Sequence, residues 1–345
     1  MNEFLFGFMP EKEWDRYVRN SKIEVNGRMI DYPLESNIWQ MEIGAQVEYL
    51  KAIAAAGCNT GMEMPVKFAE WISWKLGDRV AEDYMIPYNE KLFGKEFESL
   101  GTYWLEKLPN VSFEETLRSC LERKAYGKKP GHTEFYYPKR YGYGELWLRM
   151  ADALGDHIKY NQTVKGIDFV SKMAATVDNQ KYSADRIVST IPWMEFHELN
   201  GMPEDMKETI KELKFNSVQI EYCAGRIDTD AHWIYYPNLN LPYHRILVRH
   251  NFCPGSTGYW TETNSERVEA VRDNKKIRHM NRYAYPLNTV GKPEVMERFL
   301  AWSKRMGVIG LGRWGGHRHY NSDVTVERAM TLAEQIIYER RFTQY

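Results

Sequence analysis

The sequence predicts an α/β (α+β) protein in which a helical domain is inserted into a frame of β-strands. Apolar residues recur at helical spacing between about residues 41 and 128. The rest of the chain is dominated by short alternating or apolar runs bounded by Gly, Pro and Asn, which is typical of strands. Because no low-complexity linker or internal repeat separates the two textures, interleaved domains are expected rather than consecutive ones.

The first 130 residues give the clearest local signals. SKIEVNGRMIDYP is expected to form a β-hairpin with a tight Asn26-Gly27 turn. MEIGAQVEYLKAIAAAG predicts a helix that stops at Gly57, and VKFAEWISWKLGDRVAEDYMIPY repeats the helical pattern. A further helix is expected to begin at Ser112, because Glu115 three residues later completes a capping box.

Strand signals dominate after residue 129. EFYYPKRYGYGELWLRMADALG predicts an aromatic strand, a glycine-bearing turn and a helix. Short strands are expected on both sides of an Asp178-Asn179 turn, and residues 214–262 look rich in strands. Helices are predicted at 202–213, at 293–306 and from about Asp323 to Arg340, with the strand VIGLG between the last two.

Composition excludes several classes of function. The net charge is −1 and no basic run interleaves with aromatic residues, so neither nucleic acid nor an anionic membrane is expected as a partner. No apolar run is long enough for a transmembrane helix, and the N-terminus has no signal-peptide pattern. Four cysteines without a CxxC pair indicate a reducing, cytoplasmic location. His317 and His319 are the only close histidine pair, so no metal site is expected.

Aromatic residues make up 14% of the chain. They are explained either by a Trp-rich core or by a cleft that stacks flat rings, and composition alone favours the core.

One literal GxGxxG runs from Gly310 to Gly315. A first dinucleotide fingerprint would have to open a helix within a βαβ unit and be followed by an acid for the ribose. The polar stretch GHRHYNSD follows instead, and only thirty residues remain. We therefore do not interpret this motif as that fingerprint.

Seven segments together resemble, in order, the conserved blocks of the UDP-galactopyranose mutase family. The eukaryotic type is the most similar, and the wider amine-oxidase and protoporphyrinogen-oxidase group of FAD flavoproteins is similar more loosely. The resemblance covers about residues 18 to 340. The segments are DYPLESNI (31–38), YMIPYNEKLFG (84–94), YPKRYGYGELW (137–147), SADRIVSTIPW (183–193), HWIYYPNLNLPYHRILVRHNF (232–252), YAYPLNT (283–289) and GRWGGHRHYNSDVTVERAM (312–330).

The resemblance implies a binding site for a UDP-sugar substrate. Tyr32 matches an aromatic residue near the uracil, although Glu35 stands where the family has Gln. Asn89 would contact the nucleotide, and Phe93 replaces a Trp that lies against it. The remaining matches, which would clamp the diphosphate or line the pocket, are Arg140, Trp233, Tyr235, Arg245 and Tyr285. Two arginines and tyrosine hydroxyls suit a diphosphate. Without the resemblance, Arg140 and Arg245 are explained equally well as surface ion pairs.

The same comparison implies an FAD site. Gly142 and Gly144 would let the backbone approach the flavin, and the backbone of Val164 would hold the adenine edge. Arg313 would lie beside the flavin and support the chemistry. The other positions implied, around the pyrophosphate and ribityl chain, are Gly312, Asn321, Asp323 and Thr325. The start of the last helix is a natural phosphate site.

The domains implied are five interleaved segments. Residues 1–40 would give strands of the substrate sheet and of the FAD domain, and residues 41–129 the helical domain. The FAD domain, a truncated Rossmann-like domain, would take residues 130–200 and 301–345. Residues 201–300 would form an antiparallel substrate sheet.

The activity implied is the interconversion of UDP-galactopyranose and UDP-galactofuranose. In this reaction N5 of the reduced flavin attacks the anomeric carbon, so the protein supplies placement and charge and no catalytic nucleophile. An oxidoreductase of the amine-oxidase or protoporphyrinogen-oxidase kind is one alternative. A non-catalytic protein that binds a nucleotide sugar or a partner is another.

The family's N-terminal GxGxxG segment has no match in this sequence, because position 1 aligns after it. Three expectations follow from the resemblance: a truncated product, a partner chain that supplies the Rossmann segment, or loss of the flavin role. FAD binding and activity of the isolated chain would depend on which of these holds.

Overall fold

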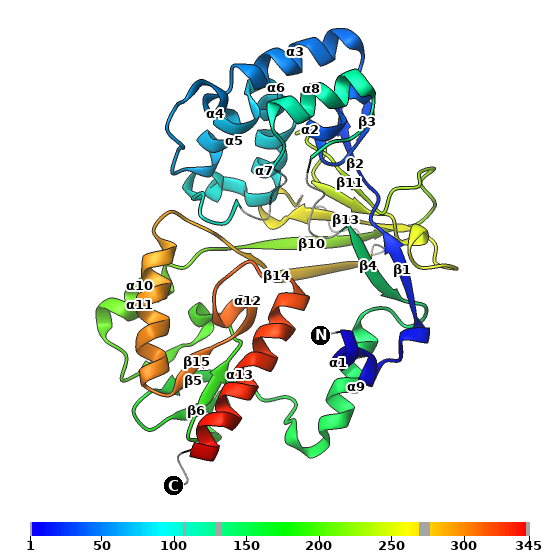
Figure 1. Ribbon diagram of the computed structural model, residues 1–345. Helices are drawn as coiled ribbons and strands as arrows, with labels where there is room; N and C mark the ends of the chain where they lie inside the picture. The colour runs from blue at the N-terminus through cyan, green and yellow to red at the C-terminus, as the bar shows by residue number, and fades with distance from the viewer. Residues whose placement is uncertain (1, 106–107, 109, 128–132, 269–276, 343–345) are drawn as a thin grey trace. The chain divides into compact units, whose positions relative to one another are not determined.

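The computed structural model describes residues 2–105, 108, 110–127, 133–268 and 277–342 (Figure 1). It contains helices and several β-sheets, which confirms the predicted α/β class. The chain divides into two compact units. The first comprises Met1–Pro10, Gly144–Phe215 and Tyr285–Tyr345, and the second comprises Glu11–Tyr143 and Asn216–Ala284. Each unit is thus assembled from distant parts of the chain. The boundary expected between residues 129 and 130 lies outside the described residues.

The second unit is built on a seven-stranded sheet with the order β14-β10-β13-β12-β11-β2-β3. The pairs β10–β13, β13–β12, β12–β11 and β2–β3 are antiparallel, and β11–β2 is parallel. A separate antiparallel pair joins β1 and β4. The strands are β1 (Trp14–Val18), β2 (Ser21–Val25), β3 (Arg28–Asp31), β4 (Glu134–Pro138), β10 (Phe215–Cys223), β11 (Trp233–Tyr235), β12 (Arg245–Leu247), β13 (Tyr259–Asn264) and β14 (Arg278–Pro286).

The predicted hairpin is confirmed as β2 and β3. Asn26 and Gly27 both have positive φ, +52° and +77°, which is the backbone that a tight two-residue hairpin turn requires. Ile23, Val25 and Ile30 are buried on one face of the hairpin. Alternation of apolar and polar residues therefore sets its register.

The helices of the second unit form a layer apart from its strands (Figure 1). They are α2 (Leu34–Asn37), α3 (Ile43–Ala54), α4 (Gly57–Thr60), α5 (Phe68–Leu76), α6 (Asp78–Val80), α7 (Ile86–Phe93) and α8 (Phe113–Glu122), with the π-helical turn η3 (Ala81–Met85) before α7. The capping box at Ser112 and Glu115 is confirmed at the start of α8. The continuous pattern over 66–88 is interrupted at Gly77, whose φ is +75°. A Cβ atom there would lie 2.4 Å from the Ala52 carbonyl oxygen, so the close approach of α3 requires glycine.

The first unit contains a four-stranded sheet, order β7-β6-β5-β9, and a parallel pair, β15–β8. Its strands are β5 (Val164–Asp168), β6 (Met173–Thr176), β7 (Lys181–Ser183), β8 (Ile187–Ser189), β9 (Glu198–Asn200) and β15 (Val308–Gly310). Its helices are α1 (Asn2–Phe8), α9 (Gly144–Leu154), α10 (Glu204–Lys211), α11 (Lys292–Arg305), α12 (Gly312–Gly315) and α13 (Ser322–Phe342). The turn predicted at Asp178-Asn179 is confirmed between β6 and β7.

The core of the first unit collects around Phe169, Trp193, Phe299 and Val308, all of which are fully buried. The Trp193 indole Nε1 donates a hydrogen bond to the Gly315 carbonyl oxygen (2.7 Å). This hydrogen bond links α12 to the core of the first unit.

The glycines of the GxGxxG motif serve close packing in this unit. A Cβ atom on Gly315 would lie 2.0 Å from the Ser189 carbonyl oxygen, and one on Gly310 would lie 2.2 Å from the Gly315 carbonyl oxygen. The last four residues of the motif form α12, which is one turn long, and residues 316–321 are not helical, as the sequence predicted. The motif holds α12 against β8 and β15.

Candidate functional site

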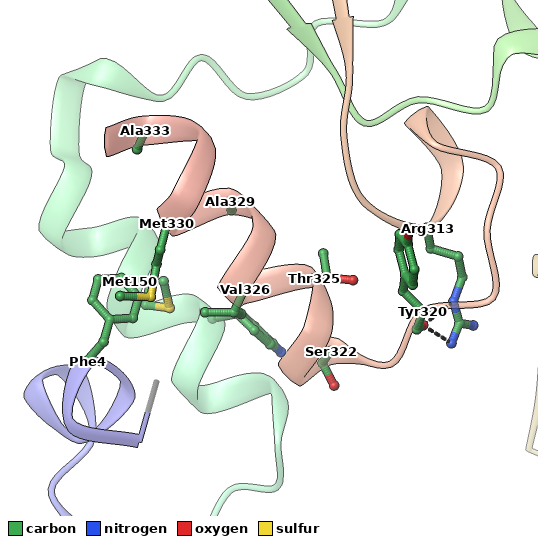
Figure 2. Close-up of a pocket in the computed structure, with 11 residues that line it drawn as sticks. Phe4, Met150, Arg313, Tyr320, Ser322, Thr325, Val326, Ala329, Met330 and Ala333 are labelled. Carbon is green, nitrogen blue, oxygen red and sulfur yellow. Dashed lines mark hydrogen bonds between the residues drawn. The ribbon is translucent and has the colours of Figure 1, made fainter. Parts of the chain in front are cut away.

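A cavity of about 690 Å³ lies along the N-terminal half of α13 in the first unit. This volume is in the range of small-molecule sites. Figure 2 shows Phe4, Met150 and Met330 pointing toward one another at one end, with Ser322 and Thr325 at the start of the helix. The lining comprises Phe4, Trp147, Met150, Arg313, Tyr320, Ser322, Thr325, Val326, Ala329, Met330 and Ala333. Most of the wall is apolar, and the polar groups gather at the beginning of α13.

The beginning of α13 carries three of the predicted FAD residues. The Thr325 amide and hydroxyl both donate to the Asn321 carbonyl oxygen, each at 3.0 Å. Asp323 is exposed in the first turn. Gly312 lies beside Thr325, since a Cβ atom there would be 3.3 Å from the Thr325 Cγ2 atom. A 21-residue helix presents amide donors and the positive end of its dipole here.

Arg313 supplies the positive charge of the cavity. Its Nε and Nη2 donate to the Tyr320 carbonyl oxygen at 2.9 and 2.7 Å (Figure 2), and its guanidinium lies 5.5 Å from the centroid of the Tyr285 ring. The Tyr285 ring in turn stacks on His319 at 4.8 Å. Burial lowers the pKa of Arg313, but an arginine remains protonated at neutral pH. The wall therefore carries a fixed cation.

Two other predicted cofactor positions of this unit are not among the residues that line the cavity. Val164 is half-buried in β5, opposite Thr176 of β6. Gly144 is exposed at the first position of α9.

In the second unit the structure brings Tyr32, Trp233 and Tyr235 together around Arg19. The Arg19 guanidinium lies 5.6 Å from the centroid of Tyr32 and 5.4 Å from that of Trp233. Its Nη2 donates to the Tyr235 hydroxyl (2.5 Å) and its Nε to the Ser21 Oγ (2.9 Å). Cation–π contacts and hydrogen bonds together fix the orientation of the guanidinium. We call this group the Arg19 cluster.

Sequence reasoning did not identify Arg19. Its ring partners lie 13 and 214–216 positions away, and they meet because β2 pairs with β11 in the sheet. The short spacing between Arg19 and Ser21 was the only local signal. A parallel pairing between two such distant strands could not be read from either segment alone.

Arg245 is occupied by an ion pair within the second unit. Its Nε and Nη2 both donate to the Glu262 Oε2, at 2.9 and 2.5 Å. Burial raises the pKa of Glu262, but the ion pair with Arg245 and the neighbouring His244 together outweigh burial and lower the pKa of that carboxyl to about 2. His244 is buried beside the pair, and burial lowers its pKa, so it is neutral. The ion pair is internal rather than on the surface.

Asn89 and Phe93 are both buried in α7. Asn89 donates to the Met85 carbonyl oxygen (2.7 Å), and the Phe93 ring meets Trp104 edge-on at 6.5 Å. Both side chains thus have roles inside the helical layer. Pro87 lies in the first turn of α7, directly after the π-helical turn η3.

Arg140 and Gly142 lie in the loop after β4. Arg140 is exposed, and Gly142 adopts φ +77° with only the Tyr137 hydroxyl within reach of an added Cβ, at 3.6 Å. The positive φ explains the glycine by backbone geometry.

Two features are absent from the described residues. No group of three or more His, Cys, Asp or Glu side chains could hold a metal ion. In the same part of the chain, no helix is both long and apolar enough to cross a bilayer.

Known proteins resemble this chain in sequence family and in fold. A family model described as flavin containing amine oxidoreductase matches residues 15–220. The structure of reduced UDP-galactopyranose mutase superposes with a TM-score of 0.81 at 18% identity, covering 91% of this chain and 75% of that one. A candidate protoporphyrinogen oxidase from Exiguobacterium sp. 255-15 gives a TM-score of 0.66 at 13% identity, covering 98% and 84%. A triple mutant of putrescine oxidase gives a TM-score of 0.55 at 12% identity, covering 97% of this chain and 85% of that one. At these identities the likeness concerns the fold.

Proposed function

The chain belongs to the flavin containing amine oxidoreductase family, and from this premise we propose that it is an FAD-dependent mutase acting on UDP-galactopyranose or a related nucleotide sugar. The observation that carries the choice of substrate is the Arg19 cluster, in which a guanidinium lies against flat aromatic rings. A nucleotide sugar offers both an anionic diphosphate and a flat base. The amine substrate of an oxidase is a cation, which the charge of Arg19 would repel.

The residues along α13 fit a flavin dinucleotide. The cavity combines an apolar wall for a ring system with the cation of Arg313 and with the hydroxyl of Ser322 and the first-turn amides of α13 for phosphate oxygens. Arg313 is held by Tyr320 and by the Tyr285 ring, so it keeps its place without a ligand. When bound, the flavin would supply a reactive ring nitrogen.

The chain's own residues would bind and orient the substrate. We assign the diphosphate and base to the second unit, with Tyr32, Trp233 and Tyr235 as ring and hydroxyl contacts. Exclusion of water from such a site strengthens the charge interactions that hold the substrate. Asn89 and Phe93 would act indirectly, by packing α7 beneath the site.

An absorbance spectrum of the purified chain, recorded before and after dithionite, tests the proposal. We expect flavin absorbance, and formation of the furanose isomer from UDP-galactopyranose only after reduction. Replacement of Arg313 by Leu should weaken FAD binding, measured by quenching of flavin fluorescence, because the fixed cation is lost. A chain that contains flavin but does not isomerise the sugar would contradict the mutase assignment.

A colourless chain that takes up no FAD would point to a partner that supplies a glycine-rich βαβ segment. The parallel pair β8–β15 supports this reading, since a parallel sheet of two strands is rarely stable without further strands. Flavin binding by the chain alone at one equivalent would remove the need for such a partner.

The second candidate function is an oxidoreductase, which the description of the family favours. Consumption of oxygen with an amine or a porphyrinogen, and no isomerisation of UDP-galactopyranose, would select it.

A further inference from the structure

We propose that Arg19, rather than Arg245, is the residue that binds the anionic group of the substrate, within an aromatic site formed by Tyr32, Trp233 and Tyr235. This inference rests on the proposed function for the identity of the ligand, a nucleoside diphosphate. It concerns only the second unit, which contains all four residues.

Arg19 uses only some of its donors in bonds to its two side-chain partners. A guanidinium carries five N–H groups. Nε bonds to the Ser21 Oγ and one Nη2 hydrogen bonds to the Tyr235 hydroxyl. No carboxylate pairs with Arg19 among the residues that the structure describes. The remaining hydrogens, including both on Nη1, are available to oxyanions in the forked geometry that phosphate accepts.

Arg245, in contrast, already has a counter-charge. Its Nε and Nη2 bond to Glu262, which is 8% exposed. A diphosphate would meet an ion pair with little net positive charge, and withdrawing Arg245 from the buried carboxylate would be strongly unfavourable. Of the two arginines, Arg19 is therefore the one whose charge is not balanced by a carboxylate in the described part of the chain.

Aromatic rings surround the Arg19 guanidinium. Arg19 is held between Tyr32 and Trp233, and the rings of Tyr32 and Tyr235 are 5.5 Å apart. These side chains are fixed before a ligand arrives, so little conformational entropy is lost on binding. Burial raises the pKa of the Tyr32 hydroxyl, which stays protonated and can donate to an oxyanion. The site suits an oxyanion attached to a flat ring.

The test is a calorimetric titration of the purified chain with UDP, with inorganic pyrophosphate and with uridine, each measured separately. The variants are Arg19→Met and Arg19→Lys, and the matched control is Arg16→Met. Arg16 lies on the neighbouring strand β1, is exposed and pairs with Glu134, so its loss removes the same charge from the same region. Circular dichroism and melting temperature check that each variant is folded.

We expect Arg19→Met to weaken UDP and pyrophosphate by about 100-fold and uridine by less than about threefold, because a neutral side chain removes only the charge-assisted bonds. Arg19→Lys should lose roughly tenfold, since an ammonium keeps the charge and not the fork. Arg16→Met should bind as the wild type does.

Equal binding of UDP by the wild type and by folded Arg19→Met and Arg19→Lys would overturn the inference and leave the proposed function standing. Binding of pyrophosphate that depends on Arg19, without binding of UDP, would support the anion site and contradict the nucleotide substrate. If the wild type binds neither UDP nor pyrophosphate at millimolar concentration, the Arg19 site does not exist.

Discussion

At the scale of single residues, Glu35 combines a carboxyl with a buried position in α2. It is 7% exposed, and burial raises its pKa to about 7. The unfolded chain loses this proton near the usual value of 4.5, whereas the folded chain keeps it up to about pH 7. The folded state thus binds more protons in this window, so the contribution of Glu35 to the free energy of unfolding falls as pH rises from 4.5 to 7.

We predict that Glu35→Gln stabilises the protein at pH 8 and changes little at pH 4.5. The upper bound of the gain is about 3 kcal/mol, given a pKa raised from 4.5 to about 7. Urea unfolding at the two pH values measures it. The control is Glu90→Gln, because Glu90 is exposed on α7. A gain of the same size at both pH values would show that ionisation of Glu35 is not the cause.

The sequence predicted those residues of the candidate site that match individual positions in the blocks of the resembled family. Tyr32, Trp233 and Tyr235 meet around one guanidinium, and Gly312, Arg313 and Thr325 lie near the start of α13. The ion pairing of the predicted arginines was not predictable from the sequence. The Arg245–Glu262 pair depends on register between β12 and β13, which local sequence does not encode.

At the scale of elements, the sequence predicted those turns and helix caps that are formed by residues close together in the chain. The Asn26-Gly27 turn and the Ser112 capping box each involve residues within four positions, and both are present. The interruption at Gly77 was not evident, because its cause is the α3 backbone some 25 residues earlier. The parallel pair β8–β15 joins strands more than a hundred positions apart. Such pairings are selected by packing of the whole unit.

We predict that Gly77→Ala destabilises the chain far more than Gly61→Ala. Both glycines have positive φ, +75° and +80°, but their ψ angles differ. Gly61 has ψ 17° in the left-handed region, where alanine costs roughly 1 kcal/mol, whereas Gly77 has ψ 158°, a backbone that essentially only glycine adopts. Only at Gly77 would the added methyl meet backbone atoms, 2.4 Å from the Ala52 oxygen, whereas Gly61 faces open space. Thermal melts of the two variants compare them. Equal losses would mean that α3 moves aside without strain.

At the scale of the whole molecule, the described part of each unit contains one buried lysine. Lys91 donates to the carbonyl oxygens of Tyr236 and Asn238, both at 2.8 Å, and Lys292 donates to that of His317 at 2.9 Å. Burial lowers the pKa of both amines to about 7. The unfolded chain therefore binds more protons than the folded chain between pH 7 and 10.5, and the lysine contribution to stability rises with pH across that window.

We predict that the melting temperature rises from pH 7 to pH 9.5, and that Lys91→Met makes this rise smaller while lowering stability at every pH, since two carbonyls lose their donor. Calorimetric scans at four pH values test the slope. Lys95→Met is the control, because Lys95 is exposed. An unchanged slope in Lys91→Met would show that Lys91 is charged in the folded protein.

The division of the chain also sets an order in time. The second unit ends at Ala284, whereas the first needs Tyr285–Tyr345. During synthesis the second unit can close before Tyr285–Tyr345 has left the ribosome. Phe169 and Trp193 are made early but must wait for Phe299 and Val308, which complete their core. Until then they are exposed apolar surface, which a chaperone would recognise and which favours aggregation. Slow translation of Tyr285–Tyr345 would prolong this state, so we expect it to lower the yield of soluble protein.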